Sequence, residues 1–308
     1  MRIIFMGTPD FAVASLKALL DNGEHVVAVV TAADKPAGRG QKLHESAVKV
    51  YAQEKGIPVL QPEKLKDPAF IAHLKSFNAD LQVVVAFRML PEVVWNMPPL
   101  GTINVHGSLL PQYRGAAPIN HAVINGEKET GVTTFLLQHE IDTGNILLAH
   151  KVAIQEQDNA GSIHDKLMIA GAETLIRTIQ GLREGSLKPI PQDDIQVSEL
   201  KHAPKIFKED CKIDWNNSTE KVFNKIRGLS PYPTAFTYLA DKVLKIYEAS
   251  QEISAVHVPA GNYITDGKSY LKYATNDGYI HLLTIQIEGK KRMSIQEFLR
   301  GFHFTETN

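Results

Sequence analysis

Short apolar runs alternate with segments of helical spacing through the first half of the chain. The runs are rich in β-branched residues and bounded by turn residues, as buried parallel strands are, and they cover residues 3–6, 26–31, 58–60 and 81–86. Helical spacing separates them at 11–20 and 46–55, and Asp67-Pro68 predicts the start of a third helix. Strands and helices in alternation predict an α/β fold with a Rossmann-like parallel sheet.

The composition changes between residues 185 and 210, where prolines and charges are dense. A capped helix at 218–228 follows, and then five short strand-like runs separated by Asp-Gly and similar turns. Regular short strands of this kind predict a small OB-like β-barrel. Because 308 residues are enough for two domains, we expect an α/β domain at 1–189, a linker at 190–205 and a β-barrel domain at 206–308.

The formal net charge of −1 excludes a basic field over the whole protein, so any nucleic-acid partner must be held by a local patch. One such patch is the segment 34–42, which follows the second predicted strand and carries Arg39, between Gly38 and Gly40, and Lys42. Loops at the carboxyl ends of parallel strands face the ligand crevice. The segment therefore suits a phosphate-bearing ligand, and its alternative is an ordinary solvated loop.

The compartment follows from one cysteine and the hydropathy. Cys211 has no second cysteine to pair with, which fits a reducing compartment. No apolar run approaches the roughly 20 residues of a membrane span, and the first six residues are typical of a buried strand rather than a signal peptide. We expect a cytoplasmic protein, and no metal site, because the histidines lack i, i+4 partners.

The turn after the first strand argues against a dinucleotide cofactor. Gly7-Thr8-Pro9 stands where a dinucleotide-binding fold has G-x-G-x-x-G, and Pro9 removes a backbone N–H. The phosphate-binding pattern G-x-x-x-x-G-K-[ST] is also missing from the sequence. The sheet therefore has the architecture of a nucleotide-binding domain but is predicted to bind another ligand.

An amide, an imidazole and a carboxylate form the candidate catalytic set. Asn104 and His106 are two apart at the end of a predicted strand, so their side chains share one face. Asp142, in Asp142-Thr143-Gly144, supplies a carboxylate from elsewhere in the sequence. Such a set can polarise a carbonyl, stabilise an oxyanion and move a proton, whereas an isolated pair could be a hydrogen-bonded strand end with a half-buried histidine.

Further motifs along the whole chain carry, together with this set, a resemblance to a known family. They are Gly7-Thr8-Pro9-Asp10-Phe11-Ala12, Lys35-Pro36-Ala37-Gly38-Arg39-Gly40, Asn104-Val105-His106-Gly107-Ser108-Leu109-Leu110-Pro111, Arg114-Gly115-Ala116-Ala117-Pro118, Asp142-Thr143-Gly144, Asp214-Trp215, Pro231-Tyr232-Pro233-Thr234 and Gly289-Lys290-Lys291-Arg292-Met293-Ser294. In this order they resemble the methionyl-tRNA formyltransferases over essentially the whole chain. One departure is Arg88, where many relatives have Gly at the rim of the folate pocket.

The resemblance implies transfer of a formyl group from 10-formyltetrahydrofolate to the α-amine of methionine on initiator methionyl-tRNA, for translation initiation, by a monomer without a metal. Asn104, His106 and Asp142 would be catalytic, and which of the last two takes the proton is left open. Backbone groups of Ser108, Leu109, Leu110 and Pro111 would line the folate site. Arg39 and Lys42 would grip the tRNA, and the C-terminal domain would extend that contact.

Other readings remain open at this point. A formyltransferase acting on a small amine, such as an amino-sugar nucleotide, would not need the basic Arg39 segment. A glycinamide ribonucleotide enzyme would lack the C-terminal barrel, and the basic segment also argues against a 10-formyltetrahydrofolate hydrolase domain. A non-catalytic tRNA-binding module would not need the set of Asn104, His106 and Asp142.

Overall fold

Seven strands form the sheet of the first half of the chain in a computed structural model that describes residues 1–37 and 42–302. The order is β10-β9-β7-β6-β1-β2-β5. Five strands are parallel, namely β1 (Arg2–Gly7), β2 (His25–Val30), β5 (Val59–Leu60), β6 (Leu81–Val85) and β7 (Thr102–His106). The last two, β9 (Glu129–Leu136) and β10 (Ile146–Ala153), extend the sheet in antiparallel register. The predicted Rossmann-like parallel sheet is confirmed.

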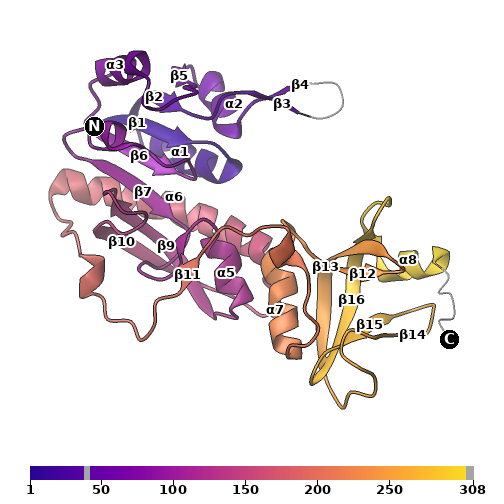
Figure 1. Ribbon diagram of the computed structural model, residues 1–308. Coiled ribbons are helices and arrows are strands. Elements are labelled where there is room, and N and C mark those ends of the chain that lie inside the picture. The colour runs from indigo at the N-terminus through magenta and orange to yellow at the C-terminus, as the bar shows by residue number, and fades with distance from the viewer. Residues whose placement is uncertain (38–41, 303–308) are drawn as a thin grey trace. The chain divides into compact units, whose positions relative to one another are not determined.

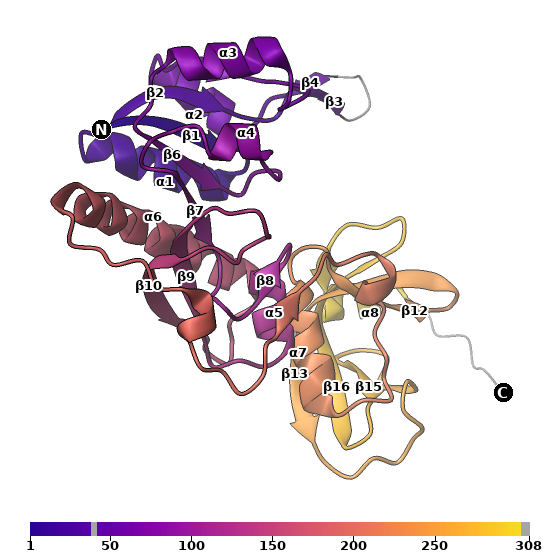
Figure 2. The same ribbon diagram turned by 60° about the vertical axis from the view of Figure 1, so that its left-hand side comes forward.

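Helices cover both faces of this sheet (Figures 1 and 2). On one face lie α1 (Asp10–Asp21) and α6 (Ala160–Glu184), where a Cβ on Gly171 would stand 3.2 Å from Val105 and 4.0 Å from the ring of Phe11. The other face packs against α3 (Pro68–Ser76) and α4 (Glu92–Trp95) through one apolar cluster that includes Phe70 and Val94. The remaining helix, α2 (Ala47–Glu54), packs beside α1. Apolar contact on both faces explains why the strands are apolar without alternation.

The ends of the predicted helices follow from local chemistry. The Ser46 hydroxyl accepts a hydrogen bond from the Lys49 amide at the start of α2. The Asp67 carboxylate accepts from two amides at the start of α3, where Pro68 occupies the first turn. Both are standard N-terminal caps that satisfy otherwise orphaned N–H groups, so their positions were predictable from sequence.

The C-terminal part forms an antiparallel sheet in the order β12-β13-β16-β15-β14, with β17 paired to β16. The strands are β12 (Ala235–Leu239), β13 (Lys242–Ile253), β14 (Tyr263–Thr265), β15 (Leu271–Ala274), β16 (Gly278–Ile287) and β17 (Met293–Ser294). The sheet curls into a half-barrel, in agreement with the predicted fold class. Helices α7 (Thr219–Leu229) and α8 (Ile295–Gly301) contribute buried side chains to its core, among them Ile226 and Phe298.

Backbone contacts divide the chain into two units that are not continuous in sequence. The first unit comprises Met1–Gly115, Glu129–Ala153 and His164–His202, and the second comprises Ala116–Lys128, Ile154–Ile163 and the rest of the chain from Ala203. Helix α5 (Pro118–Ile124) thus groups with α7 in the second unit. The boundaries that we expected, 1–189, 190–205 and 206–308, stay a prediction about independent domains.

Several short elements were not foreseen from the sequence. Two short strands at the basic segment, β3 (Lys35–Ala37) and β4 (Lys42–His44), form a hairpin in which they pair in antiparallel register. The others are β8 (Arg114–Gly115), β11 (His202–Ala203) and two 3₁₀ turns, η1 (Gln192–Asp194) and η2 (Glu209–Cys211). Elements of two or three residues carry no periodicity, so sequence patterns cannot reveal them.

Candidate active site

The end of β7 presents the predicted pair. Asn104 and His106 share one face of the strand, while Ile103 and Val105 are almost fully buried on the other. Asn104 lies in register between Val84 of β6 and Phe135 of β9. The pair therefore stands at the carboxyl edge of the parallel strands, where open α/β sheets bind their ligands.

The histidine is held in one tautomer. His106 Nε2 lies 3.0 Å from the backbone oxygen of Tyr113. A carbonyl oxygen can only accept, so Nε2 carries the hydrogen and Nδ1 of the neutral ring carries the lone pair. Nδ1 faces Asp142 Oδ2 at 3.8 Å, which is too long for a direct hydrogen bond but close enough for a carboxylate to stabilise a protonated ring. The structure thus brings His106 and Asp142 together from distant parts of the chain.

Asp142 sits in a tightly determined turn after β9. Its φ is +57°, a left-handed conformation that costs a non-glycine residue free energy. Its carboxylate accepts a hydrogen bond from the Gly115 amide at 2.9 Å. A Cβ at Gly144 would meet the backbone oxygen of Leu136 at 1.6 Å, so only glycine fits there. The Asp142-Thr143-Gly144 motif is therefore explained by the geometry that aims this carboxylate at the histidine.

Unlike His106 and Asp142, Asn104 presents its side-chain amide for hydrogen bonding to a ligand. The side chain is partly exposed, and it has no hydrogen-bond partner among residues 1–37 and 42–302. The carboxamide can both donate and accept. A donor of this kind at the ligand edge of the sheet suits a substrate oxygen.

The segment Ser108–Pro111 is anchored from within. The Thr133 hydroxyl of β9 donates to the backbone oxygen of Ser108 at 2.7 Å and accepts from the Leu110 amide at 3.1 Å. The Leu109 side chain packs where a Cβ on Gly131 would stand. Ser108, Leu110 and Pro111 are buried and Leu109 is partly exposed. These contacts fix the backbone that follows His106, and the contact of Ser108, Leu109, Leu110 and Pro111 with folate stays a prediction.

The predicted tRNA contacts are Arg39 and Lys42. Arg39 lies outside the described residues, and for Lys42 the structure gives the backbone, which begins β4. The base of the hairpin is well defined, because Lys49 Nζ lies 2.5 Å from Asp34 Oδ2 and 2.6 Å from Glu45 Oε1. Asp34 precedes β3 and Glu45 follows β4, so one ammonium group ties both ends of the hairpin.

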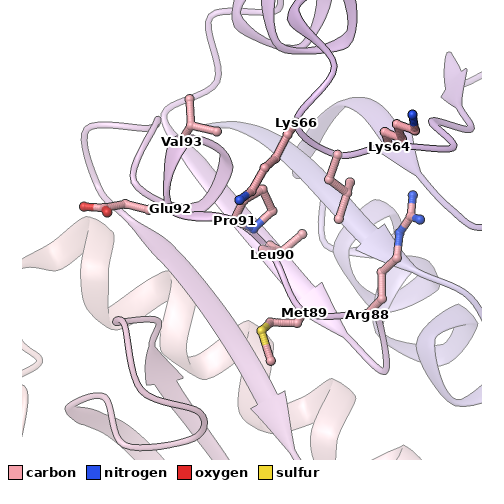
Figure 3. A pocket seen from close by; sticks show the side chains of 9 residues that line it. Lys64, Lys66, Arg88, Met89, Leu90, Pro91, Glu92 and Val93 are labelled. Atoms are coloured by element: carbon pink, nitrogen blue, oxygen red, sulfur yellow. The ribbon is translucent and has the colours of Figure 1, made fainter.

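A pocket of about 820 Å³ opens beyond the carboxyl end of β6 (Figure 3). Its walls combine apolar side chains with cations and are formed by Lys64, Leu65, Lys66, Arg88, Met89, Leu90, Pro91, Glu92 and Val93. In Figure 3 the Arg88 guanidinium and the Lys64 amine lie on one side, and the Glu92 carboxylate points away from them. Arg88 donates hydrogen bonds to the backbone oxygens of Glu63, at 2.9 Å, and Pro62. The residue that departs from the family pattern therefore lines this pocket.

Two residues of the site region were missed by sequence reasoning. Gln192 follows Pro191 in the stretch that we expected to be a linker, and its side chain contacts the Asp142 turn. Thr133 lies inside β9 and anchors the segment after His106. Neither carries a sequence signal, since a lone Gln or Thr is common and their partners are more than 20 residues away.

The described part of the chain shows neither a metal-binding cluster nor a membrane-spanning helix. No group of three His, Cys, Asp or Glu side chains there is arranged to hold a metal ion. None of the helices within residues 1–37 and 42–302 combines the length and apolar character needed to cross a bilayer.

Family models match both parts of the chain. The formyl transferase model covers residues 1–179, and the model of the formyl transferase C-terminal domain covers residues 205–303. Methionyl-tRNA formyltransferase of Bacteroides thetaiotaomicron is 54% identical, with 99% of this chain and 97% of the relative covered. The enzymes of the same description from Phocaeicola vulgatus and Flavobacterium johnsoniae are 55% and 52% identical, over 100% and 99% of this chain and 98% of each relative.

Solved structures share the fold at lower identity. HypX from Aquifex aeolicus in complex with tetrahydrofolic acid has a TM-score of 0.66 and 20% identity, with 98% of this chain and 48% of HypX covered. An N-formyltransferase from Helicobacter canadensis, in complex with folinic acid and dTDP-3-aminofucose, has a TM-score of 0.65 and 20% identity over 91% of this chain and 97% of its own. The structural likeness extends to the fold alone, whereas the identity above 50% over whole chains is decisive. The chain belongs to the methionyl-tRNA formyltransferase family.

Proposed function

We propose that this enzyme transfers the formyl group of 10-formyltetrahydrofolate to the α-amine of methionine on initiator methionyl-tRNA. The observation that carries this conclusion is identity of 54% with a methionyl-tRNA formyltransferase over 99% of the chain. The site agrees with it chemically, because an amide, an imidazole and a carboxylate meet at the ligand edge of the sheet.

The reaction places a distinct demand on each residue of the set. The amine attacks as the neutral base, and an α-amino group titrates near pH ~8. Asn104 donates a hydrogen bond to the formyl oxygen as negative charge develops there, which is worth about 10²–10³ in rate. His106 accepts the amine proton at Nδ1, directly or through a water, because Nε2 already donates to the Tyr113 oxygen. Asp142 stabilises the resulting imidazolium from 3.8 Å. As the bond between the formyl carbon and N10 of the folate breaks, the imidazolium returns the proton to N10, which leaves as the amine of tetrahydrofolate.

The formyl donor is the folate co-substrate of this family. The pocket beyond β6, of about 820 Å³, is of the size that binds small organic ligands, roughly 300–1,000 Å³, and it mixes apolar walls with a few polar groups. Its place beyond the end of β6 puts it at the same edge of the sheet as His106 on the neighbouring strand β7. We propose that this pocket and the anchored segment Ser108–Pro111 hold the folate.

The tRNA is proposed to contact Arg39, Lys42 and the second unit. Arg39 is planar and multidentate, which suits phosphates and base edges, and Lys42 adds a point charge. In the second unit the Arg292 guanidinium stacks 4.2 Å from the centre of the Tyr247 ring and lies 3.5 Å from a Glu248 oxygen. Local cations of this kind are compatible with a formal net charge of −1.

We also propose a compartment and an oligomeric state for the enzyme. A formylated initiator tRNA is used by the ribosome, so we propose that the enzyme acts in the cytoplasm at the entry to translation initiation. We also propose that it works as a monomer, since one chain carries Asn104, His106 and Asp142 together.

A direct assay with competing acceptors tests the function. The purified enzyme is given 10-formyltetrahydrofolate with charged initiator tRNA, free methionine, or an amino-sugar nucleotide. We expect rapid formylation of the charged tRNA and rates at least about 10²-fold lower for the small amines, which lack the binding energy of the tRNA body. Faster transfer to the amino-sugar nucleotide would support the small-amine alternative, and release of formate without an acceptor would support a hydrolase.

A further inference from the structure

Gln192 connects the Asp142 turn to Arg114 at the candidate active site. The residue is 3% exposed, and its side-chain nitrogen donates to the backbone oxygens of Asp142 and Gly144, each at 2.8 Å. Its side-chain oxygen accepts two hydrogen bonds from the Arg114 guanidinium, at 3.0 Å and 2.7 Å. An amide has two donors and two acceptor sites, so every hydrogen bond that this side chain can make is made.

No other side chain can make these contacts. The Asp142 turn presents two carbonyl oxygens and needs donors, whereas the Arg114 guanidinium needs an acceptor. Glutamate has the acceptors without the donors, and lysine and arginine have donors without acceptors. Asparagine has the same groups on a shorter stem. The site therefore selects an amide of this length.

The backbone on either side keeps the amide in place. Ile190, two residues earlier, exchanges two backbone hydrogen bonds of 2.8 Å with Ile146 at the start of β10. Ile146 in turn follows the Asp142 turn by two residues. Gln192 is thus tied to the strand that leaves the turn as well as to the turn itself.

We propose that Gln192 is a positioning residue for formyl transfer, holding the Asp142 turn in its left-handed conformation so that the carboxylate faces His106. The proposal rests on the function proposed above. Gln192 acts through backbone oxygens and through Arg114, and its own amide has no capacity left for a substrate. Because Asp142 Oδ2 is also held by the Gly115 amide, the two links share the task of aiming the carboxylate.

The test is a double-mutant cycle in the full chain. We expect Gln192→Ala to lower kcat by about 10-fold or more with KM for the folate changed less than about 2-fold. Gln192→Glu should lose as much, because it retains acceptors for Arg114 but turns a carboxylate toward two carbonyl oxygens. In the background of Asp142→Ala, Gln192→Ala should add less than about 2-fold, since a residue that acts through Asp142 has nothing left to position. Losses that multiply, or a Gln192→Glu variant as active as wild type, would overturn the proposal.

A second measurement distinguishes failure of the positioning proposal from failure of the proposed function. The Gly115 amide resonance reports whether the Asp142 carboxylate is seated, whatever the substrate. It should shift in Gln192→Ala in the same direction as in Asp142→Ala. Gln82→Met is the matched control, because Gln82 of β6 is another fully buried glutamine, whose side-chain oxygen accepts from Thr102, and it should leave that resonance in place. An unmoved Gly115 resonance in Gln192→Ala refutes the positioning role, whereas failure of the wild type to formylate tRNA refutes only the function.

Discussion

His106 shows how a single backbone contact assigns a chemical role. The Tyr113 oxygen takes the hydrogen of Nε2 and so leaves the lone pair on Nδ1, the nitrogen that faces Asp142. A basic nitrogen beside a carboxylate is suited to receive a proton, because the charge that forms is stabilised at once. The sequence alone leaves open which of the two residues accepts the proton, and we propose that the imidazole does so.

Replacing either residue of the strand-end pair should stop the chemistry without unfolding the protein. We expect Asn104→Ala or His106→Ala to reduce turnover by at least about 10²-fold, the scale of a lost oxyanion or proton-transfer partner. The melting temperature should stay close to that of wild type for Asn104→Ala, whose amide has no internal partner among the described residues. His25→Ala, at an exposed strand end of β2, is the control. Near-normal turnover in both folded variants would contradict the assignment.

The β3–β4 hairpin depends on one ion-pair network at its base. Hydrogen bonding to Asp34 and then Glu45 raises the pKa of Lys49, and the same bond to Lys49 lowers the pKa of Asp34. Lys49→Met should therefore increase hydrogen exchange in Lys42–His44 by about 10-fold, because the two ends of the hairpin lose their common partner. Lys17→Met removes an exposed pair with Asp21 on α1 and should change nothing there. Unaltered exchange in Lys49→Met would show that strand pairing alone holds the hairpin.

A second network crosses three strands of the C-terminal sheet. Glu252 of β13 lies 2.5 Å from His281 Nε2 and 2.9 Å from Lys272 Nζ, and hydrogen bonds from these two, His281 first, lower its pKa from 4.5 to about 2. A carboxylate with a depressed folded-state pKa stabilises the fold above its unfolded pKa and loses that effect as pH falls through the folded value.

Glu252→Gln should accordingly lower the melting temperature at pH 7. The difference from wild type should shrink as the pH falls from 4.5 toward 2, the interval between the two pKa values of this group. Melting curves at closely spaced pH values provide the measurement. Glu129→Gln removes an exposed pair with Lys151 and serves as the comparison. A difference that is constant from pH 7 to pH 2 would mean that packing, not charge, is responsible.

At the scale of the whole molecule, the second unit includes helix α5 (Pro118–Ile124), although the strands before and after it, β7 and β9, belong to the first unit. Asn120 donates a hydrogen bond to the Gly228 oxygen at 2.8 Å, and a Cβ on Gly228 would meet the Ile124 side chain at 2.5 Å. The Arg227 guanidinium of α7 donates a hydrogen bond to the backbone oxygen of Asp158 at 3.0 Å. A single cut near residue 204 would therefore separate α5 from α7, which belong to the same unit.

A chain ending at Pro204 should be less stable than the full protein. It leaves α5 without α7 and exposes Ile124, so we expect the melting temperature to fall by at least about 5 °C and dye binding to apolar surface to rise. Ile124→Gln should improve the solubility of the shortened chain and destabilise the full one. A shortened chain that melts like the full protein would mean that the first 204 residues fold as an independent domain.

Local features were decided by the sequence. Apolar runs with β-branched residues predicted the parallel strands, and Asp67-Pro68 predicted where a helix starts, because caps and periodicity act within a few residues. The shared face of Asn104 and His106 follows from the two-residue repeat of a strand in the same way. Asp142 joined this candidate set as a carboxylate from elsewhere in the sequence, and the formyltransferase resemblance, confirmed by whole-chain identity, implied that the set is catalytic.

Tertiary structure decided what depends on contacts between distant segments. The tautomer of His106 is set by a carbonyl seven residues away, the aim of Asp142 by Gly115 and Gln192, and the surroundings of α5 by α7 more than a hundred residues later. Such contacts leave no periodicity in the sequence, since each is one hydrogen bond or one packed side chain. The sequence therefore determined the secondary-structure elements and the candidate set of Asn104, His106 and Asp142. The fold determined which atoms of these residues face one another.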